Sequence, residues 1–232
     1  MKKKLIALGA LFAICLSMLA TDMVVKQKNG EIVRFDVSEV NEVIFSESNP
    51  EDTTVVDASE TPLEFKIISD STVEVTGVNK DSESIEIPSK VKIDGKVYTV
   101  NSIKYSAFSW KRSLTTLEIP SSITSIAESS VFSGSPNLKS INVASDNPNF
   151  SSVDGVLFNK QKNYLQEFPR SKATTYMIPD YVDTIGNLAF ASNHNIISIS
   201  FSPNSQLKHI EKEAFMGCVF MQRLELPTSL QS

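Results

Sequence analysis

The chain has 232 residues, with 22 lysines and arginines against 27 aspartates and glutamates, a net charge of −5 and two cysteines. Its 41% hydrophobic content is typical of a folded chain and argues against general disorder. The acidic balance argues against a nucleic-acid partner or an anionic membrane surface, since both select a basic face. Two histidines and two cysteines are too few for most metal sites.

The N-terminus has the composition of a secretory signal peptide. Three lysines precede an apolar run over residues 5–20, which is short for a membrane span of about 20 residues. We therefore predict that residues 1–20 are a signal peptide and that the chain is exported, either secreted or displayed at the cell surface. Lipid attachment at Cys15 is the alternative, although the bulky Ile14 before it does not fit a lipobox. After signal removal we expect no integral membrane segment and one cysteine, Cys218.

A small module and a linker follow. We expect residues 21–46 to form a β-hairpin module, because Asn29-Gly30 supplies the positive φ angles of a type I′ turn between two apolar strands. Glu42–Phe45 predicts a third short strand. Residues 47–61 are acidic, contain proline and are poor in large apolar side chains, so we predict a linker there.

Residues 62–232 are dominated by an internal repeat of about 24 residues. The pattern L-x-x-L-x-L, often followed by proline, begins at Leu114, Leu138, Ala173, Ile196 and Met221, and a degenerate copy starts near residue 84. A second short apolar segment then leads to a phenylalanine, namely Phe108, Phe132, Phe190 or Phe215. One repeat leaves apolar edges exposed, so several must stack into one core. We predict that these isoleucines and phenylalanines are the most buried residues.

Three segments depart from the repeat. Residues 63–78 predict a hairpin that caps the first repeat. Asp154-Gly155 predicts a turn in an insert whose strands protrude from, or extend, one edge of the solenoid. The last repeat is incomplete at Ser232, which would leave an open edge for self-association with a second copy. A truncated, non-functional repeat fragment is the alternative interpretation.

The segments LTTLEIPSSITSI, YMIPDYVDTIGNLAF, LKHIEKEAFMGC and NPNFSSVDGVLF resemble BspA-like leucine-rich repeats, over roughly residues 63–232. The resemblance implies a mainly β solenoid with short helical turns, preceded here by the small hairpin module. It also implies a secreted or surface protein of bacteria that mediates adhesion to host matrix proteins or to other microbes. It supplies no catalytic residues.

The sequence contains no catalytic or cofactor-binding motif. Phosphate-binding glycine loops and the G-x-S-x-G elbow are absent, so we predict no enzymatic activity, no cofactor and no metal. Four isolated sets could still carry chemistry, but turn or core roles fit each of them better. They are Cys218 as a reactive thiol, His194 with His209 as a metal pair, Asp146, Asn147 and Asn149 as a calcium loop, and Asp180 with Asp183 as an acid–base pair.

The candidate binding face lies between the buried positions of L-x-x-L-x-L, where alternate residues point outward. It is either a solvated sheet surface or a broad, shallow protein-binding surface. Its residues are Thr116, Glu118, Ser140, Asn142, Thr175, Met177, Ser198, Ser200, Arg223 and Glu225. We predict a non-enzymatic protein that binds other proteins or mediates adhesion. A glycan-binding module is the alternative, with Trp110 as either a cap residue or an exposed aromatic anchor.

Overall fold

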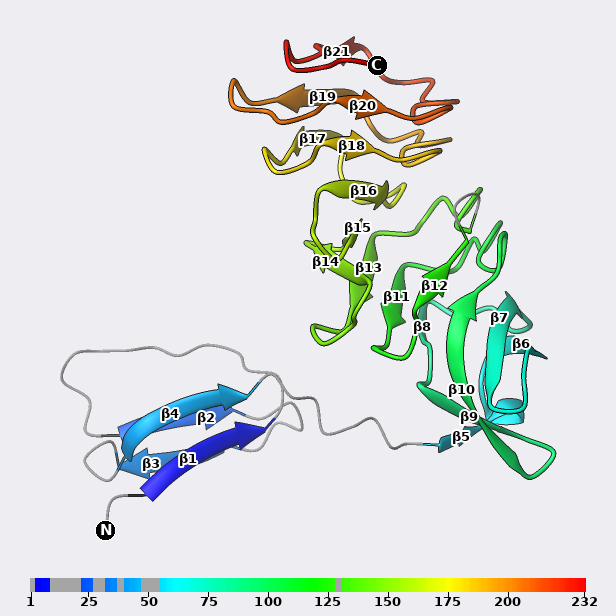
Figure 1. The fold of residues 1–232 in the computed structure, drawn as a ribbon, viewed down its shortest axis with the longest axis vertical. Helices are drawn as coiled ribbons and strands as arrows, with labels where there is room; N and C mark the ends of the chain where they lie inside the picture. Colours follow the sequence, from blue (N-terminus) through cyan, green and yellow to red (C-terminus); the bar gives the residue numbers. More distant parts are fainter. Residues whose placement is uncertain (1–2, 9–21, 27–31, 37–39, 47–54, 128–130) are drawn as a thin grey trace. The chain divides into compact units, whose positions relative to one another are not determined.

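The computed structural model describes residues 3–8, 22–26, 32–36, 40–46, 55–127 and 131–232 (Figure 1). The chain divides into two compact units, Met1–Thr53 and Thr54–Ser232. In the first unit, β2 (Asp22–Lys26) pairs antiparallel with β3 (Ile32–Asp36), as the predicted hairpin requires. The third predicted strand is β4 (Val40–Ser46), which pairs in parallel with β1 (Lys3–Leu8).

Strand β1 lies inside the predicted signal peptide. The rest of that peptide, with Cys15, and residues 47–54 of the predicted linker lie outside the described residues. Because β1 is hydrogen bonded along β4, removal of residues 1–20 would leave that edge of β4 without this partner.

The second unit begins earlier than the predicted linker allows. β5 (Val55–Asp57) pairs in parallel with β9 (Lys90–Ile93), and the 3₁₀ helix η2 (Ala58–Glu60) follows it. The Asp57 carboxylate accepts a hydrogen bond from the backbone N–H of Ser59 at 3.1 Å and so caps this helix. The linker prediction for residues 47–61 is therefore too long, because backbone pairing to β9 orders a stretch that has few large side chains.

The predicted cap hairpin corresponds to the antiparallel pair β6 (Leu63–Ile67) and β7 (Thr72–Val78). A further hairpin, β9 with β10 (Lys96–Ile103), adds to it and gives the sheet order β5-β9-β10-β7-β6. Its turn is Asp94-Gly95, where both residues have positive φ, at 50° and 81°. This hairpin was not predicted from the sequence, because its strands carry lysines between the apolar residues.

The repeats form stacked parallel strands, seen as successive levels in Figure 1. One three-stranded sheet, the first sheet, contains β8 (Ser84–Glu86), β11 (Thr116–Ile119) and β13 (Ser140–Val143). Another, the second sheet, contains β17 (Thr175–Ile178), β19 (Ser198–Phe201) and β21 (Arg223–Leu224). The second apolar segment forms the end of β10 before Phe108. In three later repeats it gives a two-residue strand, namely β12 (Ser125–Ile126), β18 (Thr184–Ile185) or β20 (His209–Ile210).

The insert was predicted either to protrude from the solenoid or to extend one of its edges, and the structure shows that it extends a sheet. Its strands β14 (Phe150–Val153), β15 (Val156–Asn159) and β16 (Tyr164–Glu167) continue through β16 into β18 and β20. Asp154-Gly155 forms the turn between β14 and β15, with φ angles of 50° and 74°. Strand β15 is buried on both faces, since Leu157 packs into one apolar cluster and Val156 and Phe158 into the next.

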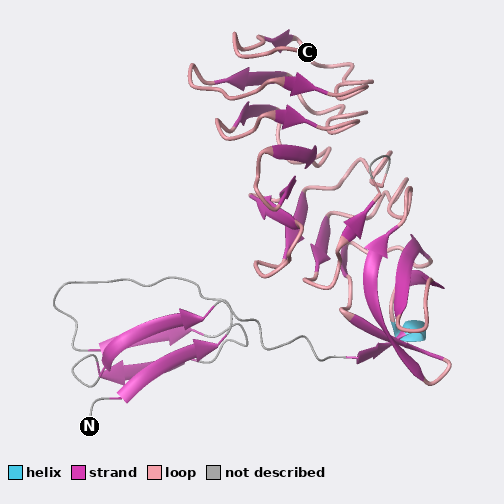
Figure 2. Cartoon of the chain, viewed as in Figure 1, coloured by secondary structure: helices cyan, strands magenta, loops and turns pink. Residues whose placement is uncertain are grey.

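Three of the four repeat phenylalanines, Phe108, Phe132 and Phe190, are buried as predicted, and Phe168 from the insert joins them. Phe215 in the last repeat is only half-buried, so the prediction is wrong for that residue. Phe108 stacks on Phe132 at 5.9 Å between ring centroids, and Phe168 stacks on Phe190 at 4.8 Å. Figure 2 shows strands and loops throughout, and η2 is the one helix that the described residues contain. The described turns before Phe108, Phe190 and Phe215 are thus not helical, unlike the short helical turns that the family resemblance implies.

Candidate functional site

The structure divides the ten predicted face residues between two sheets. Thr116 and Glu118 on β11 lie opposite Ser140 and Asn142 on β13, and we name these four the first row. The other edge of β13 bonds to the insert, since the Ile141 N–H donates to the Gly155 carbonyl at 2.9 Å. The ladder of the first row therefore does not continue into β17.

Side chains of the first row form hydrogen bonds with one another. The Ser140 hydroxyl donates to the Asn142 side-chain oxygen, and the Asn142 amide donates to the Glu118 carboxylate, both at 2.7 Å. All four residues are half-buried. Three of the four side chains thus bond to one another, so this row fits a structural role better than a binding one.

The second row is more open. It consists of Thr175, Met177, Ser198, Ser200, Arg223 and Glu225, and all but Ser198 are exposed. Thr175 lies opposite Ser198 and Met177 opposite Ser200, while Ser198 also faces Arg223 on β21. Met177 is 62% exposed, and Arg223 pairs with Glu225 in solvent. Met177 and Arg223 lie on the two outer strands of this sheet, with β19 between them. An exposed thioether and an exposed guanidinium are both groups that protein interfaces favour.

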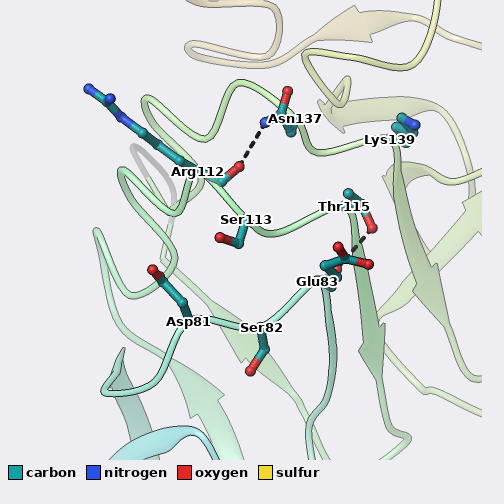
Figure 3. A pocket seen from close by; sticks show the side chains of 8 residues that line it. All are labelled: Asp81, Ser82, Glu83, Arg112, Ser113, Thr115, Asn137 and Lys139. Carbon is teal, nitrogen blue, oxygen red and sulfur yellow. Dashed lines mark hydrogen bonds between the residues drawn. The ribbon is translucent and has the colours of Figure 1, made fainter.

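A polar pocket of about 470 Å³ lies where β8, β11 and β13 begin (Figure 3). Its charged lining residues are Asp81, Glu83, Arg112 and Lys139, and its neutral ones are Ser82, Ser113, Thr115 and Asn137. Two internal bonds shape it: the Thr115 hydroxyl donates to the Glu83 carbonyl at 2.9 Å, and the Asn137 amide donates to the Arg112 carbonyl at 2.8 Å. The sequence alone did not predict this pocket, although Glu83 and Lys139 stand at equivalent repeat positions.

A buried ion pair joins the two apolar clusters of the core. Arg170 is 3% exposed, and its Nη1 donates to the Phe132 carbonyl at 2.7 Å and to the Glu167 carboxylate at 3.1 Å. Burial raises the pKa of Glu167 to about 7, although the neighbouring Arg170 charge opposes that shift. Phe132 belongs to the cluster before the insert, so this arginine connects it to the repeats that follow.

The isolated candidates have structural partners. Asn147 is fully buried: its amide donates to the carbonyls of Pro120 and Ile123, and its oxygen accepts from the N–H groups of Asn149 and Phe150. Asp183 accepts from Asn163 and Thr184, whereas Asp180 accepts from Ser202. These contacts leave each residue in a corner of the fold with separate partners.

Cys218 and the histidines have similar local roles. The Cys218 thiol lies 3.1 Å from the Phe190 carbonyl, and burial raises its pKa, which opposes thiolate chemistry at neutral pH. The His209 ring bonds to the Ser232 hydroxyl at 2.8 Å, while His194 is exposed. Within the part of the chain that the structure describes, no three His, Cys, Asp or Glu side chains gather as a metal site would require.

The described residues also contain no helix with the length and apolar character needed to cross a bilayer.

Trp110 is 73% exposed, so it is an exposed side chain and not a buried cap residue. Its ring lies over Gly134, where an added Cβ would come within 2.6 Å of the indole. The tryptophan is therefore held against the backbone of the next repeat and still faces solvent.

Solved structures with a similar fold include a leucine-rich repeat protein from Eubacterium ventriosum, with 16% identity, a TM-score of 0.43, and 85% of this chain and 62% of that chain covered. A leucine-rich repeat protein from Bacteroides ovatus has 22% identity and a TM-score of 0.43, over 73% of this chain and 53% of that one. A leucine-rich cell surface protein from Faecalibacterium prausnitzii has 15% identity and a TM-score of 0.37, over 73% and 82%.

This chain spans less than two thirds of the length of the Eubacterium ventriosum structure. No curated protein matches the sequence. The profile of the BspA type leucine-rich repeat region matches six copies, over residues 78–168 and 164–232, and so confirms the resemblance carried by the repeat motifs. The chain belongs to the BspA-type leucine-rich repeat family.

Proposed function

We propose that this chain is an exported, non-enzymatic protein, secreted or held at the cell surface, which binds proteins of the host matrix or of neighbouring microbes. The predicted signal peptide supports export, and membership of a repeat family that generally acts by binding supports the partner class. Adhesion is the biological outcome that we infer from these two properties together.

The observation that carries the proposal is the second row. Stacked parallel strands hold its side chains at intervals of about 4.8 Å on a rigid sheet. Five of its six residues are exposed, and Met177 and Arg223 supply the apolar and guanidinium groups that anchor protein interfaces. Such a surface can bind a partner with little loss of its own conformational entropy.

The test is direct binding of the purified chain to immobilised matrix proteins and to surface proteins of co-resident bacteria. The double variant Met177→Asp, Arg223→Glu should weaken binding at least tenfold, since each change removes an anchor. The control Lys92→Glu alters an exposed charge on β9, outside the second row, and should bind as the wild type does. Equal binding by the double variant and the wild type would contradict a role for this row.

Trp110 supports glycan binding as a second candidate. An exposed indole held against Gly134 offers a flat apolar platform on which a sugar ring can stack. A glycan array with the wild type and Trp110→Ala distinguishes the two candidates. Binding that Trp110→Ala abolishes would favour the glycan, whereas an array without signal would leave the protein-binding proposal as the better one.

A further inference from the structure

We propose that the polar pocket at the start of the first sheet binds an extended peptide segment in a polyproline II conformation, with a basic and an acidic residue three positions apart. This site is separate from the second row. It therefore goes beyond the proposed function, and either one can fail without the other.

The pocket carries an ordered ladder of side chains. Glu83, Thr115 and Lys139 each stand directly before a strand of the first sheet, in matching register. The Thr115 N–H donates to the Glu83 carbonyl and the Lys139 N–H donates to the Thr115 carbonyl, both at 2.8 Å. Since adjacent strands lie about 4.8 Å apart, a carboxylate and an ammonium group arise from backbone positions about 10 Å apart, with a hydroxyl between them.

A second set of side chains reinforces this polarity. Asp81, Ser113 and Asn137 stand two residues earlier at the same three levels, so the acidic end lies at β8 in both sets. Arg112 adds positive charge to the lining, although Figure 3 shows its side chain extending away from the other residues. Asp81, Glu83, Arg112 and Lys139 are exposed, and none forms an ion pair with another described residue.

The repeat pattern gives a reason for the hollow. The residue two positions before the strand is Leu114 in the β11 repeat and Leu138 in the β13 repeat, and both are fully buried. The β8 repeat has Ser82 there, and this serine lines the pocket. A short hydroxyl side chain thus stands where the next two repeats have a leucine, which leaves room for a ligand.

The charge separation selects the ligand. In a free amino acid the ammonium and carboxylate groups are attached to the same carbon, so they cannot reach both ends of the ladder. A polyproline II segment has three residues per turn and a rise of about 3.1 Å per residue, so side chains three positions apart share a face at about 9 Å. This value matches the ladder. The lining contains no aromatic ring, and so offers no stacking platform for a sugar.

The probes are capped, proline-rich synthetic peptides that differ only at two positions three residues apart. One carries Lys and Glu, one carries two Lys, one carries two Glu and one carries two Ala. Fluorescence anisotropy with the full 232-residue chain at low salt should show the mixed peptide binding about fivefold tighter than the others. That preference should shrink as salt rises, because the charges are exposed.

Charge reversal tests the assignment of each end. Glu83→Lys should shift the preference to the peptide with two Glu, and Lys139→Glu should shift it to the peptide with two Lys. Ser82→Leu should weaken the mixed peptide by occupying the hollow. The matched control is Thr174→Lys, which adds a charge directly before β17, the equivalent position in the second sheet, and should leave the wild-type ranking unchanged.

Three results would overturn the proposal. They are no detectable binding of the mixed peptide, equal binding of all four peptides by the wild type, and an unchanged ranking in folded Glu83→Lys protein. Circular dichroism melting curves identify variants that fail to fold. Loss of binding to matrix proteins in the Met177→Asp, Arg223→Glu variant, with the peptide ranking intact, would separate this pocket from the second row.

Discussion

Single side chains connect the two apolar clusters of this solenoid, and Arg170 is the clearest case. It reaches the Phe132 carbonyl and the Glu167 carboxylate, while its Nε has no hydrogen-bond partner among the described residues. Both charges are removed from water, and desolvation can cost as much as such a pair returns. We therefore expect the pair to contribute more to the relative position of the two apolar clusters than to the free energy of unfolding.

Burial of Glu167 predicts a pH dependence of folding. Its pKa rises from an unfolded value near 4.5 to about 7, so the folded state holds the proton more tightly. The associated stability is fully present below pH 4.5 and is lost as the pH rises through about 7. The free energy of unfolding should fall by about 3 kcal/mol over this range. Urea unfolding at several pH values should show this loss in the wild type.

The variant Glu167→Gln serves as the control for that slope, since its amide keeps a hydrogen-bond acceptor for Arg170 but does not titrate. It should unfold at nearly constant urea concentration between pH 5 and pH 7. A wild-type profile that is also flat over this range would show that Glu167 does not carry the dependence.

Asn147 predicts a second effect at the scale of one residue. Asn147→Ala removes four hydrogen bonds from a fully buried turn and leaves carbonyls unpaired, so the free energy of unfolding should fall by about 3 kcal/mol. The neighbouring Asn149→Ala removes one exposed side-chain donation, to the Thr124 carbonyl, and should cost under about 1 kcal/mol. Similar losses in the two variants would contradict the structural role of Asn147.

At the scale of elements, the strands of the repeats were predictable because their apolar residues alternate and proline or a turn ends them. The turn at Asp154-Gly155 was predictable because glycine tolerates its positive φ of 74°. Strand β5 was not, because Val55–Asp57 is ordered by pairing with β9, a partner about 35 residues away. The Arg170–Glu167 pair and the pocket likewise depend on which repeats become neighbours.

Two Asp-Gly turns allow a matched test of the insert. Gly95 and Gly155 both have positive φ, but a Cβ on Gly95 would meet nothing within 4 Å, whereas one on Gly155 would lie 2.3 Å from the Ser140 hydroxyl oxygen. Gly95→Ala should cost only the left-handed backbone penalty, about 1 kcal/mol. Gly155→Ala should cost about 2 kcal/mol more, because β13 must also move.

Chemical unfolding of both variants, with tryptophan fluorescence from Trp110, measures this difference. Equal losses of stability in the two variants would contradict close packing of the insert turn against β13. They would also contradict the close approach that the hydrogen bond from the Ile141 N–H to the Gly155 carbonyl indicates.

Over the whole molecule, repetition produces the proposed binding surface. The same strand position recurs in each repeat, and stacking turns six residues scattered over residues 175–225 into the second row. The sequence predicted the ten outward positions, since outward residues follow from strand period. It could not predict that the insert separates four of them from the rest, because this depends on how β14 and β15 fold back onto β13.

The most direct test of the proposed function is amide hydrogen exchange of the full chain, measured with and without a protein that it binds in the binding experiment. We predict slower exchange on binding in peptides that cover β17, β19 and β21, with β6 and β7 of the cap unchanged. Unchanged exchange in β17, β19 and β21, with protection elsewhere in the chain, would contradict it.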